Sequence, residues 1–110
     1  MSIETILELP VRPGDEARVV ELFRALGIFD LAARNEGFLG ARLCLPDRAG
    51  EQLVVIARWT DEAAIRRWVD DPERVRTNAV LAPHLADEPA RRGYTVAVEW
   101  PPTPTGGDQP

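Results

Sequence analysis

The stretch VVIARWTDEAAIRRW, Val54 to Trp68, joins a strand pattern directly to a helix pattern. Its first half is rich in β-branched and aromatic residues, which predicts a strand. Thr60 or Asp61 then offers an N-cap for the helix that follows. Two of the three tryptophans of the chain, Trp59 and Trp68, end this strand and sit within this helix. They either fill the core between a sheet and a helix or line a pocket for a flat ligand, and the sequence leaves both interpretations open.

Composition restricts the class of protein. The 110 residues are the size of one domain, and the net charge of -5 argues against nucleic acid as a partner. The chain has no apolar run of the roughly 18 residues that a membrane span needs, and its first residues lack a signal peptide pattern. We therefore expect a cytoplasmic protein with no membrane partner. Cys44 is the only cysteine, which excludes an intrachain disulfide and a zinc site built on several cysteines.

Three further strands are predicted around the opening stretch. Period-two patterns predict strands at 3–11, 38–45 and 93–100, in addition to the strand at 52–59. Turn residues at 46–51 predict that the second and third strands form a hairpin.

Helical periodicity fills the gaps between these strands. It predicts a helix over 17–34 with a break near Gly27, a second helix that Thr60 or Asp61 begins, and a further helical stretch that starts at Asp71 and Pro72. The order βαββαβ is that of an α+β, ferredoxin-like fold with one antiparallel sheet and the helices on one face. We place this domain at 1–100 and expect 101–110 to be a disordered tail.

Alternation assigns the two faces of the predicted sheet. The face toward the helices is almost wholly apolar, and it collects Ile3, Thr5, Leu7, Leu9, Leu39, Ala41, Leu43, Leu45, Leu53, Val55, Ala57, Trp59, Tyr94, Val96, Val98 and Trp100. The other face mixes Ile6, Val54, Ile56 and Ala97 with the charged residues Glu4, Glu8, Arg42, Arg58 and Glu99. A homodimer through this face explains both its apolar centre and its charges, with glutamates pairing with arginines. The alternative is an ordinary half-solvated antiparallel sheet.

Two segments carry a resemblance to a known family. NEGFLG, residues 35–40, resembles the entry to the second strand in the antibiotic biosynthesis monooxygenase family. IARWTDEA, residues 56–63, resembles the strand-to-helix signature ERWxDxEA of that family. The resemblance covers roughly residues 3 to 100 and implies a dimeric α+β barrel.

The resemblance also implies an activity. It points to a cofactor-independent monooxygenase that acts on a polycyclic aromatic, polyketide-type intermediate of antibiotic biosynthesis, without metal, flavin or haem. A polyketide cyclase on the same scaffold and a non-catalytic dimeric binding or stabilising subunit are the alternatives. In the anthrone-type oxygenases of the family, an asparagine stands four residues before the strand-end tryptophan. The matching position here is Val55, which slightly favours the cyclase.

The candidate site residues follow from the pocket interpretation. Substrate would contact Trp59, Trp68, Val55, Leu7 and Phe23. Three polar side chains are the catalytic candidates, and each has an ordinary structural role as its alternative. His84 is the single histidine, a residue type suited to acid–base chemistry, and it either reaches the mouth of a cleft or is an exposed loop residue. Asn78 either orients a carbonyl or is solvated. Tyr94, expected on the helix side of the sheet, either donates to a substrate oxygen or caps the core. We expect no metal ligands.

Overall fold

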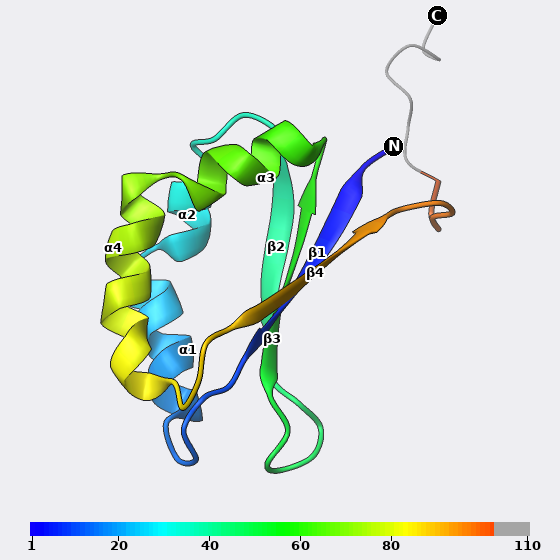
Figure 1. Ribbon diagram of the computed structural model, residues 1–110. Coiled ribbons are helices and arrows are strands. Elements are labelled where there is room, and N and C mark those ends of the chain that lie inside the picture. Colours follow the sequence, from blue (N-terminus) through cyan, green and yellow to red (C-terminus); the bar gives the residue numbers. More distant parts are fainter. Residues whose placement is uncertain (103–110) are drawn as a thin grey trace, which may run out of the picture.

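The computed structural model describes residues 1–102, which form one antiparallel sheet covered on one face by helices (Figure 1). The strands are β1 (Ile3–Leu9), β2 (Phe38–Cys44), β3 (Leu53–Trp59) and β4 (Ala90–Thr95), and the sheet order is β2-β3-β1-β4. The helices are α1 (Glu16–Ala25), α2 (Ile28–Ala32), α3 (Glu62–Val69) and α4 (Pro72–Leu81), followed by a 3-10 turn, η1 (Ala82–His84). This confirms the predicted α+β ferredoxin-like fold and its hairpin of β2 and β3. No helix within these residues combines the length and apolar character that crossing a bilayer requires.

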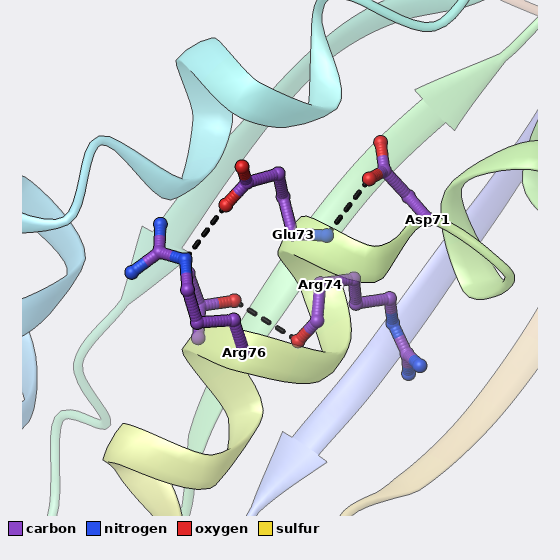
Figure 2. Close-up of polar contacts among 5 residues, drawn as sticks. Asp71, Glu73, Arg74 and Arg76 are labelled. Atoms are coloured by element: carbon purple, nitrogen blue, oxygen red, sulfur yellow. Dashed lines mark hydrogen bonds and ion pairs between the residues drawn. The ribbon is translucent and has the colours of Figure 1, made fainter.

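Local signals explain where the helices begin and end. The break predicted near Gly27 separates α1 from α2, and Gly27 has the left-handed φ of 61° that an L side chain rarely adopts. Asp61 caps α3, since its Oδ1 accepts the backbone N–H of Ala64 at 2.9 Å. Asp71 caps α4 in the same way, with the backbone N–H of Glu73 at 2.9 Å (Figure 2). The side chain of Asn35 donates to the other carboxylate oxygen of Asp71 at 3.0 Å, and this bond, with the Glu73 N–H, lowers the pKa of Asp71.

The prediction for the fourth strand was wrong in position. β4 spans Ala90–Thr95 instead of 93–100. The chain pairs with the segment after β1 soon after it leaves η1. The N–H of Ala86 donates to the carbonyl of Pro10 at 2.7 Å. Pairing of the backbone therefore overrides the β propensity of the later residues. Val98 and Trp100, expected beneath the helices, lie beyond the strand and are 93% and 87% exposed.

The predicted alternation in β2 was also wrong at its start. An irregularity in pairing between Phe38 and Gly40 acts as a β-bulge, so Phe38 stands opposite Trp59 and faces the helices. Leu39, which strict alternation placed on that side, is 54% exposed instead. Leu45 lies after the end of the strand and is likewise exposed. Of the predicted tail at 101–110, residues 103–110 lie outside the described part of the chain.

The core consists of two apolar clusters, and the buried Trp59 of one of them also makes a polar contact. Trp59 is 3% exposed, and its ring meets that of Phe38 edge-to-face, with centroids 5.2 Å apart. The indole N–H of Trp59 donates to the hydroxyl of Thr5 at 3.0 Å, and both side chains are buried. Because the two buried polar groups are hydrogen-bonded to each other, neither adds the free-energy cost of a buried polar group without a partner.

Within residues 1–102, no helix covers the second face of the sheet (Figure 1). Arginines and glutamates pair on this face, as expected: Arg58 forms ion pairs with Glu4, at 3.7 Å, and with Glu99. Arg92 lies 3.3 Å from Glu8. These pairs neutralise much of the charge on this face.

Substitution of Gly37 should lower the free energy of unfolding more than substitution of a turn glycine with a similar φ angle. Its φ is 94°, and a Cβ there would lie 2.5 Å from Thr60 Oγ1 and 2.6 Å from Ala64 Cβ. Gly14 has nearly the same φ, 92°, but no atom within 4 Å of such a Cβ. We expect Gly14→Ala to cost about 1–2 kcal/mol from backbone strain alone, and Gly37→Ala to cost more by a further 1–3 kcal/mol or so from the forced contacts. Equal losses in urea denaturation would contradict the close approach of Gly37 to Thr60 and to Ala64 of α3.

The Trp59–Thr5 hydrogen bond should appear as coupling in a double-mutant cycle. Trp59→Phe and Thr5→Val each leave one buried polar group without a partner, which costs about 1–3 kcal/mol in addition to any loss of packing. The double variant removes both groups, so its free energy of unfolding should be higher than the sum of the single effects predicts. Strictly additive losses would show that the two side chains do not interact.

Candidate functional site

A cavity of about 450 Å³ lies between the sheet and the helices. The sheet contributes Leu7, Leu9, Phe38, Ala41, Val55, Ala57 and Trp59, and the helices contribute Phe23, Ile28, Phe29, Ala32, Trp68 and Leu81. Arg74, Asn78, Ala82 and residues 85–89 complete the wall. The volume and the apolar lining with a few polar groups are typical of a small-molecule site.

The two tryptophans belong to the core and to the cavity wall at the same time. Trp59 is held by Phe38 and Thr5, so its ring is fixed by the protein's own contacts. Trp68 is half-buried and packs against both apolar clusters of the core. The two interpretations that the sequence left open are therefore compatible, because the core itself leaves room beside these rings.

α4 supplies the polar part of the wall. Arg74 and Asn78 are four residues apart, so they lie one above the other on the same face of the helix. The side chain of Arg74 leaves α4 on the side away from Glu73 and Arg76, which pair with each other at 2.7 Å (Figure 2). Burial is the main cause that lowers the pKa of Arg74, and the positive charge of Arg91 adds to it.

Two carboxylates stand at the rim of the cavity, on the segment between η1 and β4. Asp87 and Glu88 both contribute to the wall and are exposed to solvent. The Oδ1 of Asp87 accepts the backbone N–H of Glu88 at 2.8 Å. The cavity thus combines an apolar interior with a cation and an amide on α4 and two carboxylates on the segment before β4.

Six of the eight sequence candidates come together around this cavity. Its wall includes all five of the side chains expected to bind substrate, namely Trp59, Trp68, Val55, Leu7 and Phe23, and also Asn78. Sequence reasoning missed Arg74. The signal was present, because Arg74, Thr77, Asn78 and Leu81 follow the helical spacing of one face, and Thr77 and Leu81 are buried.

Two candidates lie elsewhere. The predicted position of Tyr94 on the helix side was wrong: it stands opposite Glu4, so it projects from the uncovered face and is 49% exposed. The physical reason is the early start of β4, which fixes the register with β1. His84 is outside the cavity wall, and its Nδ1 lies 3.1 Å from Oδ2 of Asp15, before the start of α1. η1 turns this side chain toward α1 instead of toward the cavity.

Known structures share this fold. SnoaB, a cofactor-independent oxygenase from Streptomyces nogalater, superposes with a TM-score of 0.75 at 22% identity, with 92% of this chain and 98% of that chain covered. The protein Rv0793 from Mycobacterium tuberculosis gives 0.75 at 17% identity, with 91% and 99% covered. A conserved protein from Methanosarcina mazei Go1 gives 0.74 at 17%, with 86% and 91% covered.

Sequence comparison identifies the family. No curated protein sequence matches the chain significantly. The family profile described as antibiotic biosynthesis monooxygenase matches residues 2–80, which include β1, the hairpin, α3 and most of α4. This chain therefore belongs to the antibiotic biosynthesis monooxygenase family.

Proposed function

We propose that the chain is a cofactor-independent monooxygenase that oxidises a polycyclic aromatic, polyketide-type intermediate of antibiotic biosynthesis. The observation that carries this proposal is the cavity of about 450 Å³ with Trp59 and Trp68 in its wall. Flat aromatic rings stack favourably on such side chains and bury a large apolar area. The likeness to SnoaB, itself a cofactor-independent oxygenase, supports the reaction class.

The chemistry needs little from the protein beyond binding and proton transfer. An anthrone-type ring carries an acidic methylene between aromatic rings, and loss of a proton gives a carbanion that can pass an electron to O₂. The methylene becomes a carbonyl, one oxygen atom enters the product and the other leaves as water. The substrate supplies every electron that O₂ accepts. Asp87 and Glu88 are the wall carboxylates that can accept the proton, and the apolar interior keeps water from the reactive carbon.

A polyketide cyclase is the second candidate, and Val55 favours it. Val55 lines the cavity on β3, where the anthrone-type oxygenases of the family carry an amide, and a valine can neither donate nor accept a hydrogen bond. A cyclase would hold a flexible chain in a folded pose, so that proximity supplies most of the rate.

Oxygen uptake separates these possibilities. The purified, metal-free protein with a panel of anthrones should consume O₂ faster than the spontaneous reaction, with one labelled oxygen atom appearing in the product. Ala41→Leu narrows the cavity and should lower kcat/KM by about tenfold or more. Ala79→Leu makes the same change on an exposed position of α4 outside the wall and should leave the rate unchanged.

The other outcomes of this assay point elsewhere. Binding of the anthrones without uptake would sink the oxygenase for this panel and favour the cyclase or a non-catalytic binding subunit. An equal loss of rate in Ala41→Leu and Ala79→Leu would show that the reaction does not take place in the cavity.

We also propose that two copies associate through the uncovered face of the sheet. Ile6, Val54 and Ile56 form an apolar centre there on neighbouring strands, and the ion pairs of Arg58 reduce the charge that association would bury. The exposed Leu39 enlarges this apolar surface.

This association should respond to a charge at the centre of the face. Ile56→Glu should convert a dimer to a monomer in sedimentation velocity, because it buries an unpaired carboxylate in the interface. Val75→Glu is the control, since Val75 lies on α4 and is 60% exposed. A monomeric native protein at micromolar concentration would refute the dimer.

A further inference from the structure

We propose that Arg74 selects ligands that carry an ionised oxygen, a phenolate or an enolate, and that Asn78 contacts the adjacent ring carbonyl. The site would therefore prefer an acidic hydroxylated aromatic ketone to its neutral ether. This inference rests on the proposed function, because it assigns the recognition of substrate within the same cavity. Arg74 would act as a specificity-determining residue.

The first support is the unused hydrogen-bonding capacity of Arg74. A guanidinium carries five N–H donors, and the contact that the structure gives Arg74 is one of 3.5 Å from Nη1 to the carbonyl of Val69. Within residues 1–102, no carboxylate forms an ion pair with Arg74. The adjacent Glu73 pairs instead with Arg76, on the other side of α4 (Figure 2). The donors of Arg74 therefore remain available to a ligand.

The second support is electrostatic. Arg74 is partly buried beside an apolar cavity, where a charge without a partner is costly. Arg91 stands opposite Leu7, a residue of the wall, and its positive charge disfavours that of Arg74. Both effects lower the pKa of Arg74, and an anion held by Arg74 would offset both. The carboxylates of Asp87 and Glu88 lie in the same wall but are exposed to solvent, which screens their charge. The surroundings of the guanidinium of Arg74 therefore favour a negatively charged ligand.

Asn78 gives the second point of contact. It lies one helical turn after Arg74 on the same wall. An amide can donate to a carbonyl oxygen and cannot compensate a charge. A ligand with an ionised oxygen near a ring carbonyl would thus meet two different partners at a fixed spacing, and these would set its orientation over the tryptophans.

A pair of probes that differ only in their ability to ionise tests this assignment. 2-Hydroxyanthraquinone changes its visible spectrum when its phenol ionises, whereas 2-methoxyanthraquinone cannot ionise. Bound to the native protein, the hydroxy probe should show its ionised spectrum at a lower pH than when it is free in solution. Arg74→Met should weaken binding of the ionised probe by about tenfold or more, the usual loss for a charge-assisted hydrogen bond. It should change the affinity for the ether by less than about twofold.

Three further variants control for other effects. Arg76→Met removes an exposed cation from the same helix and should alter neither affinity. Arg74→Lys keeps the charge and should retain part of the preference for the ionised probe. Asn78→Leu should weaken both probes by a similar factor, because both carry the ring carbonyl. Melting temperatures of all variants show whether each is folded.

The outcomes are distinguishable. Equal loss of both probes in Arg74→Met, or no loss of either, overturns the assignment. Failure of the native protein to bind either probe overturns both the assignment and the proposed function. A preference for the ionised probe that depends on Arg74, in a protein that consumes no O₂ with anthrones, supports the anion site while the monooxygenase fails.

Discussion

The double pairing of β1, with β3 on one side and β4 on the other, is the constraint on which the rest of the structure depends. Its register with β3 sets Thr5, Leu7 and Leu9 toward the helices and Glu4, Ile6 and Glu8 toward the uncovered face. The same strand fixes β4, so a single register decides the surroundings of three strands. A slip of one residue would move the apolar set out of the core and separate Thr5 from the indole of Trp59.

Much of this arrangement could be predicted from periodicity. The alternation of apolar residues is regular from Ile3 to Leu9 and from Leu53 to Trp59. The N-cap residues Asp61 and Asp71 mark where α3 and α4 begin. The predictions that failed concern the start of β2 and the bounds of β4, which depend on pairing with other segments and not on the local sequence pattern. The bulge before Gly40 depends on how β2 meets β3, and the early start of β4 depends on the backbone contact of Ala86 with Pro10. Neither interaction can be predicted from the local sequence of the residues whose positions it changes.

The residues of the cavity wall also differ in how well the sequence predicted them. Its apolar members were predictable because Leu7, Val55 and Trp59 share one face of the sheet by simple alternation. The polar members were harder to predict, because a polar residue on a helix is usually solvated. Asn78 was recognised as a polar residue on a useful helix, while Arg74 was not among the candidates. Tyr94 shows the opposite error, since a chemically suitable side chain was placed on the wrong face by a shifted register.

The bond between Trp59 and Thr5 has a consequence for how this scaffold can change over time. The indole N–H of Trp59 is already engaged, so toward the cavity the ring offers only carbon and π density. If flat molecules bind in the cavity as proposed, the sheet would therefore contact many of them in the same way and distinguish poorly among them. Selection among such ligands would then depend on α4, whose residues take no part in the pairing of the strands. Substitutions on that one helix can redirect such a chain to a new ligand while the architecture beneath it stays intact, which suits a fold that accommodates many activities.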